Sequence, residues 1–547
     1  MAYQYRRTTK SGTYVYECES FRDKVTGKVV TKQVCIGKID PTTNELVINS
    51  KSDNPDIIKD LGAYLILDQA ANQTKMITAL KASFPDDWID ILTCAMFMSG
   101  NERALYKCEQ YCETAIVPSN KPLKSQYLSR LLRRISLSGR NNFFKLWNAS
   151  HLSNEYYALD ITSISSYSNL VDYFEWGYNR DGEALPQVNL MYLVGEDNKI
   201  PLYYEAFNGS ITDSKTLENF FVSASEFGIK AIKLVMDKGF YSTSNIKTLF
   251  DEGAIFCISV PFTSNFPKAI VDKVKNDLIS PKKYLYNHEC YADSYIYENN
   301  GKKAKVHVFF DEVLCANEKK KVYEQVEKAD NLLSALRTRY ESDLALLKAE
   351  YERSLKKKSR ENLDQWLNEQ KNILRHELYK AIKKHESCFD IVYSNNSFTH
   401  TRNSEKINEL TKYKGYLAII TNDFSKTSEK VLDIYREKDV VEKKFNDIKN
   451  AIDSDRLGVH SSEVLDGKLF IIFLSTILIN YIRKIIRGNK ALEKYSLELL
   501  LKEANKLKII KYASGTKKLN VISSKQREIF SAFSLSETYI KKQALEL

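Results

Sequence analysis

The sequence lacks the cysteine pattern of a disulfide-bonded or zinc-stabilised protein. Its nine cysteines are an odd number without regular spacing, and no two of them form a Cys-x-x-Cys pair. This pattern argues against a disulfide framework and a structural zinc site, and it favours a reducing compartment. We therefore expect free thiols.

The sequence also lacks a long apolar run. Residues 1–7, Met-Ala-Tyr-Gln-Tyr-Arg-Arg, contain no apolar core of a signal peptide, so we expect none. The most apolar segment, residues 469–482, includes Asn480 and is shorter than the roughly 20 residues that a membrane-spanning helix needs. We predict a buried helix there and no membrane partner.

Size and charge set broad limits. A chain of 547 residues is too long for one core and should divide into several domains. Lys plus Arg number 81 against 70 for Asp plus Glu, which gives a net charge of +11. This balance favours an anionic partner, although a solvated basic surface explains it equally well.

Two acids stand on predicted strands. Asp160 lies within residues 156–163, which are rich in β-forming residues. Asp237 ends the apolar strand predicted for residues 231–236, just before a turn that contains Gly239.

A third acid lies on a predicted helix. Tyr435, Lys438, Glu442 and Lys449 follow the spacing Y-x2-K-x3-E-x6-K. At about 100° per residue, these positions fall within roughly 60° of one another, so we expect one shared helix face. The adjoining apolar stripe, which would seat the helix on a sheet, consists of Val441, Phe445, Ile448 and Ile452.

These acids converge if the two strands are neighbours and the helix packs across them, as in a ribonuclease H-like fold. Three close carboxylates repel one another, so they need divalent cations, and hard oxygen ligands suit magnesium. Such a site is suited to two-metal phosphoryl transfer. Alone, each acid would more often be structural, but Asp160, Asp237 and Glu442 together favour a catalytic set.

These residues resemble the bacterial insertion-sequence transposases of the DDE type, in the branch with the signature Y-x2-R-x3-E-x6-K. The chain departs from the signature at Lys438, because lysine holds a phosphate as a point charge and cannot grip it bidentately. Residues 177–217, including Pro186-Gln187-Val188, are similar to the second and third strands and first helix of the family's catalytic core. Family-like stretches cover most of residues 1–262 and 428–482.

The resemblance implies a transposase that cuts DNA at the ends of its own element and joins them to a target. Asp160, Asp237 and Glu442 would hold two magnesium ions, with manganese as a substitute. The implied partners are double-stranded DNA of the terminal repeats and the target, and a second copy in a homodimeric DNA complex. The implied location is the bacterial cytoplasm, in association with the nucleoid.

Two other classes of function stay open beside this one. The first is a transposase-derived DNA-binding protein without strand transfer, and the second is a coiled-coil scaffold, which leaves the acids unexplained. By resemblance, the residues that would contact phosphates near the cleaved end are Tyr435, Lys438 and Lys449.

The basic helix predicted for residues 125–134 carries Arg130, Arg133 and Arg134 beside an apolar stripe. It could lie along DNA, or it could be an ordinary amphipathic helix with a basic solvent face. Trp176 is a second open case, because it could stack on an unpaired base or simply pack against the protein surface.

Between Asp237 and Glu442 the chain is far longer than the basic fold requires, which indicates an insertion. Strand-like stretches at 284–297, 305–310 and 390–394 flank a charged helical block. Apolar residues from Val322 to Tyr351 step by threes and fours, as in a coiled-coil seam. The predicted second arm of this helical hairpin and its basic tip, which could touch DNA or be a solvated turn, comprise Leu363, Leu367, Leu374, Leu378 and residues 356–360.

The expected fold is a multidomain α/β protein with a ribonuclease H-like core. Alternating aromatic and polar residues near the N terminus predict strands, and the pattern becomes helical from Ile57 to Leu146. The expected parts are an N-terminal β module for DNA ends (1–60), a helical DNA-binding domain (61–150), a core in two parts (151–262 and 429–487), a β and coiled-coil insertion (263–428), and a helical tail for dimerisation (488–547).

Overall fold

The computed structural model shows a mixed α/β protein with several sheets. The chain divides into two compact units. The first unit comprises Met1–Ile232 and Lys438–Leu547, and the second comprises Lys233–Glu437. The structure describes residues 2–546 except 23–28, 42, 49–54, 101–103, 169–170, 180–181, 230–231, 300, 355–367, 370, 374, 377–378, 381, 383–385, 395–396, 440, 442–444, 446–448, 450–456 and 513–514.

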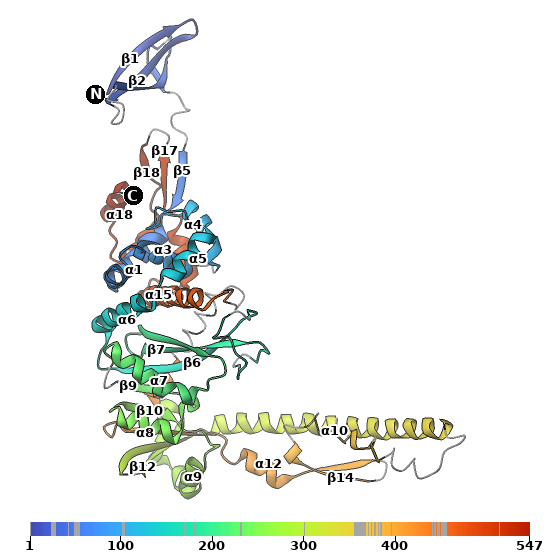
Figure 1. Ribbon diagram of the computed structural model, residues 1–547. Helices are drawn as coiled ribbons and strands as arrows, with labels where there is room; N and C mark the ends of the chain where they lie inside the picture. Colours follow the sequence, from blue (N-terminus) through green and yellow to red (C-terminus); the bar gives the residue numbers. More distant parts are fainter. Residues whose placement is uncertain are drawn as a thin grey trace. The chain divides into compact units, whose positions relative to one another are not determined.

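The N-terminal residues form a four-stranded antiparallel sheet (Figure 1). Tyr5 and Tyr16 are cross-strand partners whose rings stack with centroids 5.5 Å apart, which stabilises the first strand pair. The predicted strands of this segment are confirmed. In sheet order they are β1 (Ala2–Thr9), β2 (Gly12–Arg22), β3 (Val29–Ile39) and β4 (Leu46–Ile48).

A second sheet of the first unit carries Asp160. Its antiparallel strands are β6 (Tyr156–Ser165), β7 (Gln187–Gly195) and β8 (Pro201–Asn208). β7 lies between the other two and is buried along its whole length. The helix that follows is α7 (Asp213–Glu226), so the two strands and helix predicted within residues 177–217 are confirmed.

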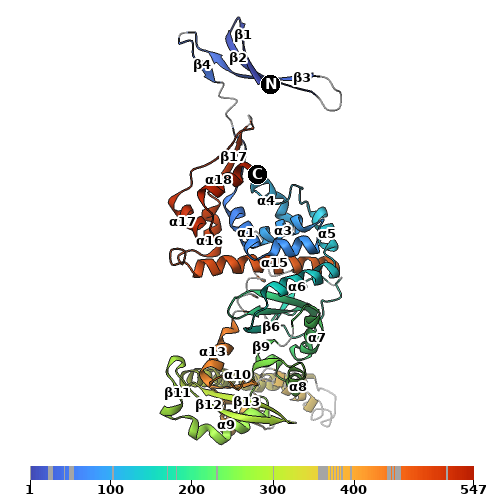
Figure 2. The same cartoon turned by 90° about the vertical axis from the view of Figure 1, so that its left-hand side faces the viewer.

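Helices that precede β6 in the sequence pack against a long helix from the C-terminal half, α15 (Ser462–Arg487). α15 contacts α1, α3 and α5 (Figure 2). Its N terminus is capped by Ser461, whose hydroxyl accepts the N–H of Val464. The helices before β6 are α1 (Gly62–Gln73), α2 (Met76–Ser83), α3 (Trp88–Ser99), α4 (Cys108–Thr114), α5 (Ser125–Arg134) and α6 (Leu137–His151).

α15 is the one helix among the described residues that is long and apolar enough to cross a membrane, by length and composition only. However, 78% of its most apolar window is buried inside the protein. Phe143 of α6 packs edge-on against Phe470, and Arg140 pairs with Asp466 at 2.7 Å. The predicted buried helix at residues 469–482 is therefore confirmed, and it extends beyond both predicted ends.

The C-terminal residues pack against the start of the helical region. β5 (Pro55–Asp60) pairs antiparallel with β17, and the side chain of Asn505 accepts the N–H of Ala63 in α1. The expected helical start at Ile57 is wrong, because β5 forms by pairing with a strand near the other end of the chain. A purely helical tail is wrong as well, because β17 pairs with both β5 and β18. The tail comprises α16 (Leu497–Ala504), β17 (Lys508–Tyr512), β18 (Lys517–Leu519), α17 (Ser524–Ala532) and α18 (Glu537–Glu546).

The second unit contains strands in the order β11-β12-β13-β16-β10-β9. β9 (Lys233–Met236) and β10 (Ile255–Ser259) are parallel and are joined through α8 (Thr243–Asp251). The remaining pairs are antiparallel. The other strands and helices here are β11 (Tyr284–Leu285), β12 (Cys290–Asn299), β13 (Lys302–Phe310), β16 (Tyr416–Thr421), α9 (Asn265–Leu278), α12 (Ser404–Thr411) and α13 (Ser428–Glu437).

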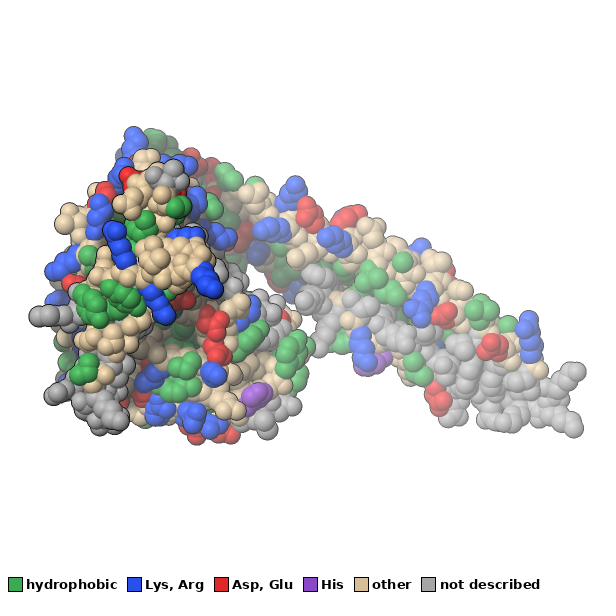
Figure 3. Space-filling view, turned by 90° about the horizontal axis from the view of Figure 1, so that it is seen from above, with side chains coloured by type: hydrophobic (Ala, Val, Ile, Leu, Met, Phe, Trp, Pro, Cys, Tyr) green, Lys and Arg blue, Asp and Glu red, His purple; other side chains and the backbone are tan. Residues whose placement is uncertain are grey.

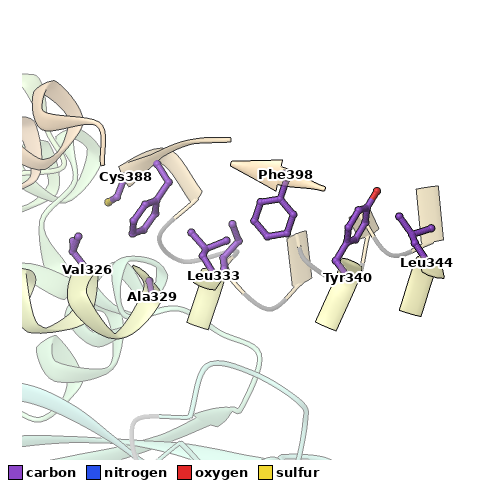
Figure 4. Close-up of a cluster of buried hydrophobic side chains, with 9 residues drawn as sticks. Val326, Ala329, Leu333, Tyr340, Leu344, Cys388 and Phe398 are labelled. Atoms are coloured by element: carbon purple, nitrogen blue, oxygen red, sulfur yellow. The ribbon is translucent and has the colours of Figure 1, made fainter. Parts of the chain in front are cut away.

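Helix α10 (Glu312–Ser354) has 43 residues and is about 65 Å long at 1.5 Å per residue. Val326, Leu333 and Leu344 lie on its buried face (Figure 4). Opposite them lie Cys388 and Phe398, which belong to or adjoin a β hairpin. Both signs of charge are interspersed along the exposed side of this arm (Figure 3). The hairpin strands are β14 (Phe389–Tyr393) and β15 (Phe398–Arg402).

The apolar stripe predicted as a coiled-coil seam is buried, but the prediction missed part of what covers it. A β hairpin covers part of the stripe, and Arg402 fixes it there through ion pairs to Glu327 at 2.5 Å and Asp330 at 2.6 Å. Described residues within the predicted second arm, such as Ile373, are helical, and Ile382 just beyond it packs on the stripe. Its key leucines, Leu363, Leu367, Leu374 and Leu378, and the basic tip at 356–360 lie outside the described residues.

Packing between α5 and α15 depends on Gly467. A methyl group there would lie 2.3 Å from the backbone oxygen of Leu132. We expect Gly467→Ala to push the helices apart and lower the free energy of unfolding by about 1–3 kcal/mol, the usual cost of overpacking. Chemical denaturation measures this change. Gly100→Ala is the matched control, because its methyl would lie 3.5 Å from Phe97, and an equal loss there would contradict the packing argument.

Candidate active site

Asp160 interrupts the buried strand β6. Leu159 and Ile161 beside it are each 1% exposed, whereas Asp160 is half-buried. Its Oδ1 accepts the backbone N–H of Ile161 at 2.8 Å, which fixes the carboxylate against its own strand. The carboxylate is therefore held in place and remains partly accessible.

Asp237 follows directly after the last residue of β9, as predicted. It is half-buried, and a short 3-10 turn, Lys238–Phe240, follows it. Asn245 fixes this turn by donating its side-chain amide to the Phe240 carbonyl at 2.7 Å. A rigid turn thus places Asp237 at the carboxyl end of a buried strand.

Tyr435 of α13 contacts Asp237 directly. Its phenol donates a hydrogen bond to Asp237 Oδ1 at 2.9 Å, within the second unit. Burial, and then the nearby negative charge of Asp237, raise the pKa of the Tyr435 phenol well above its usual value. The phenol therefore stays protonated and remains a donor. The sequence analysis assigned Tyr435 a phosphate contact and missed its hydrogen bond to Asp237. The sequence did hold one indication of this bond, because Tyr435 borders the buried face formed by Val431, Leu432 and Ile434.

The expectation of one continuous helix from Tyr435 to Lys449 is wrong at Lys438. α13 ends at Glu437, and Lys438 lies in a turn whose carbonyl accepts the N–H of Val441 at 2.9 Å. This backbone bond spans three positions instead of the four of an α-helix, so the regular helical repeat is interrupted at Lys438. Tyr435 and Lys438 consequently do not share a helix face.

Beyond the turn, the described residues Val441, Phe445 and Lys449 are helical. Val441 and Phe445 are buried, and the Phe445 ring meets Tyr192 edge-on with centroids 6.2 Å apart. Tyr192 is the cross-strand partner of Asp160, so the two side chains stand on the same face of the sheet. This segment therefore packs on the face that carries Asp160, as the apolar stripe predicted, while Glu442, Ile448 and Ile452 lie outside the described residues.

The remaining charged residues of the helix region have partners of their own. Lys438 Nζ lies 3.9 Å from Asp439 Oδ1, and its side chain is 15% exposed. Arg436 is exposed and donates to Nδ1 of His288 at 2.8 Å. Lys449 is half-buried. Within the described part of the chain, no three His, Cys, Asp or Glu side chains form a group that could hold a metal ion.

Comparison with known proteins identifies the family. Residues 154–478, which contain all three acids, match the family model described as "Transposase DDE domain". The chain belongs to this transposase family. No curated protein matches it.

A solved structure similar to this transposase is the "Cryo-EM structure of piggyBac transposase synaptic complex with hairpin DNA (SNHP)". The two chains are 8% identical, and the alignment covers 83% of this chain and 71% of that chain with a TM-score of 0.35.

In this transposase, the basic helix α5 buries Leu128, Leu131 and Leu132 and exposes its arginines. Arg134 forms a two-pronged ion pair with Asp87, with nitrogen to oxygen distances of 2.9 and 2.7 Å. The helix is thus amphipathic, which agrees with both interpretations. The exposed Arg130 and Arg133 remain candidates for DNA contact, whereas Arg134 would have to leave Asp87 first.

The bond between Tyr435 and Asp237 can be measured by a double-mutant cycle. We expect Tyr435→Phe and Asp237→Ala to be coupled by about 1.5–3 kcal/mol in unfolding free energy, because the hydrogen bond joins a buried donor to a charged acceptor. Tyr295→Phe is the control, since its phenol bonds to Asp293 instead. Additive effects of the first pair would show that the bond contributes nothing.

Proposed function

We propose that this protein is a DNA transposase that cleaves the ends of its own insertion sequence and joins them to target DNA by two-metal phosphoryl transfer. The observation that carries the proposal is the family match, which spans Asp160, Asp237 and Glu442. Asp160 is a fixed, half-buried break in the buried strand β6, and Asp237 is a fixed, half-buried residue directly after β9.

The proposal includes a ribonuclease H-like core in which the strands of Asp160 and Asp237 are neighbours. Its support within the first unit is the helical segment around Phe445, which packs on the Asp160 face of the sheet. Glu442 precedes Phe445 by three residues, about one helical turn. The proposal puts Glu442 on the same helical surface as Phe445, since residues one turn apart in a helix are neighbours.

The donor set suits magnesium, because all three proposed ligands are carboxylates and hard cations prefer oxygen. Two magnesium ions, or manganese in their place, would activate water or a terminal 3′-hydroxyl and stabilise the departing oxygen. The protein's own contribution is to hold the ligands still. The Ile161 N–H fixes Asp160, and the Tyr435 phenol fixes Asp237.

The proposed partners are double-stranded DNA of the element ends and the target, with two copies of the chain in the DNA complex. Lys438 and Lys449 would contact phosphates near the cleaved end, together with the exposed arginines of α5. The N-terminal sheet and the helical region before β6 would bind the element ends, and the C-terminal tail would support dimerisation. The proposed site of action is the bacterial nucleoid.

Removing any proposed metal ligand should abolish cutting but leave binding to element ends intact. We expect Asp160→Ala, Asp237→Ala and Glu442→Ala each to slow cleavage by roughly a thousandfold or more, because metal stabilisation of the transition state is worth several kcal/mol. The measurement is product formation from DNA that carries the element ends, with magnesium, beside a gel-shift assay of binding.

Asp197→Ala is the matched control for these variants, since Asp197 is an exposed aspartate in the turn after β7. It should cut like the parent. Normal cleavage by any of the three acid variants would remove that residue from the site. A parent protein that binds the ends but never cuts them would instead support a transposase-derived DNA-binding protein.

The phosphate contact proposed for Lys438 is tested by salt dependence. Lys438→Ala should weaken end binding and reduce the slope of log affinity against log salt by about one unit, because one fewer counterion is released. Lys438→Arg should restore binding, since its planar group can take two phosphate oxygens. Arg436→Ala is the control. If Arg436→Ala reduces the slope and Lys438→Ala does not, the assignment to Lys438 is wrong.

A further inference from the structure

Helix α13 carries a stripe of charged side chains on a side that does not face Asp237. Glu429, Asp433 and Arg436 follow one another at intervals of four and three positions, so they are neighbours along the helix. Tyr435 lies about 100° from Arg436 and about 200° from Asp433 around the helix axis. The stripe and the Tyr435 phenol therefore lie on different sides of α13.

The stripe meets the turn between β11 and β12. This turn is a short 3-10 turn, Tyr286–His288, followed by Glu289 in the left-handed backbone conformation at φ 52°. The side-chain amide of Asn287 donates to the Glu429 carboxylate at 3.0 Å. β12 also contacts α13 (Figure 2). The turn therefore lies against the helix, within the second unit.

His288 bonds to two residues of the stripe at once. Its Nδ1 lies 2.8 Å from a guanidinium nitrogen of Arg436, and its Nε2 lies 3.1 Å from Asp433 Oδ1. The His288 side chain is only 11% exposed, so these two partners replace most of its contact with water. The imidazole thus joins two positions of α13 that are about one helical turn apart.

The two partners determine which ring nitrogen of His288 carries the hydrogen. Arginine stays protonated and can only donate, so Nδ1 of His288 must accept from Arg436. Nε2 then carries the hydrogen of the neutral ring and donates it to the Asp433 carboxylate. A side chain that replaces His288 must therefore accept on one side and donate on the other.

A separate polar contact fixes the beginning of α13. The hydroxyl of Ser428, the first residue of the helix, lies 2.9 Å from Nδ1 of His307. His307 is fully buried on β13. The helix is thus held at its first residue from β13 and near its last residue from the turn that contains His288. Both supports oppose rotation of α13 about its axis, and such a rotation would move the Tyr435 phenol away from Asp237.

We propose that His288 is a positioning residue for Asp237, which acts through α13 and the Tyr435 phenol. The two bonds of the imidazole set the rotation of α13, and the phenol then donates to Asp237 Oδ1 at 2.9 Å. The importance of His288 for cleavage rests on the proposed function, in which Asp237 is a metal ligand. The bonds themselves need neither metal nor DNA.

The first test measures the bond between Tyr435 and Asp237 in the full-length protein without metal or DNA. The coupling between Tyr435→Phe and Asp237→Ala is determined from unfolding free energies, once in the parent and once with His288→Ala. We expect His288→Ala to reduce this coupling by about half or more, because α13 can then rotate. His288→Gln should keep most of the coupling, since its amide can accept from Arg436 and donate to Asp433.

His400→Ala is the matched control for this measurement. His400 lies on β15 in the same unit, its side chain is 8% exposed, and its Nε2 lies 3.0 Å from Asp330 Oδ1. The variant removes the same type of bond from another part of the unit and should leave the coupling unchanged. The proposal is overturned if His288→Ala leaves the coupling unchanged, if His400→Ala reduces it equally, or if His288→Gln behaves like His288→Ala.

The second test measures cleavage of DNA that carries the element ends, at varied magnesium concentration. We expect His288→Ala to need about tenfold more magnesium for half-maximal cleavage, the lower end of the effect of changing an outer-shell partner of a metal ligand. In the Tyr435→Phe background the same change should add less than about twofold, because both changes act through one bond. Arg436→Ala should raise the magnesium requirement like His288→Ala and leave the salt slope of end binding unchanged, because its guanidinium bonds to His288.

The two tests separate the positioning role from the proposed function. If the parent never cuts element ends but His288→Ala weakens the coupling, the proposed function fails and the positioning role stands. If the parent cuts and neither the coupling nor the magnesium requirement depends on His288, the positioning role fails and the function stands.

Discussion

Burial of α15 is the constraint on which the first unit depends. A helix that is apolar around its circumference must be covered on all sides, and 78% of the most apolar window of α15 is buried. The helices before β6 cover it from one end of the sequence and α16 covers it from the other. The β5–β17 pair and the Asn505 cap on α1 join these two ends, so the chain termini cooperate in enclosing one core helix.

The same helix supports the sheet that carries Asp160. α15 contacts β8, and Phe473 of α15 packs near Tyr192 and Tyr204 of the sheet. The helical segment at Phe445 also reaches Tyr192. Tyr192, the cross-strand partner of Asp160, is thus fixed in an aromatic cluster, while Asp160 itself is only half-buried. This arrangement suits a group that must stay still and yet meet a charged ligand.

The end of α13 at Glu437 separates Tyr435 from Lys438, which were expected to share one helix face and to contact phosphates together. Because α13 stops at Glu437, the phenol reaches Asp237 while Lys438 belongs to a turn. The aspartate then gains a neutral donor that limits its motion without cancelling its charge. An interaction of this type orients a ligand residue in the way that outer-shell hydrogen bonds orient metal ligands in general.

The sequence by itself determined the element types near the acids and the family. β6 and β9 were predictable, because runs of β-forming and apolar residues are local properties that survive in any fold that buries them. β7, β8 and α7 followed from the family resemblance of residues 177–217. The order of the acids and the spacing around Glu442 indicated the transposase family, which the match over residues 154–478 confirms. Burial of residues 469–482 was predicted from the short apolar run and from Asn480 within it.

Only the tertiary structure decided features that depend on partners distant in sequence. β5 and β17 are each too short and too charged for their sequences to predict strands, and they pair with each other in the structure. The buried stripe of α10 was visible, but the β14–β15 hairpin that covers part of it was not, since a helix stripe specifies an apolar partner and not its type. The bond from Tyr435 to Asp237 likewise depends on a distant partner, because it forms where α13 packs on β9 and β10.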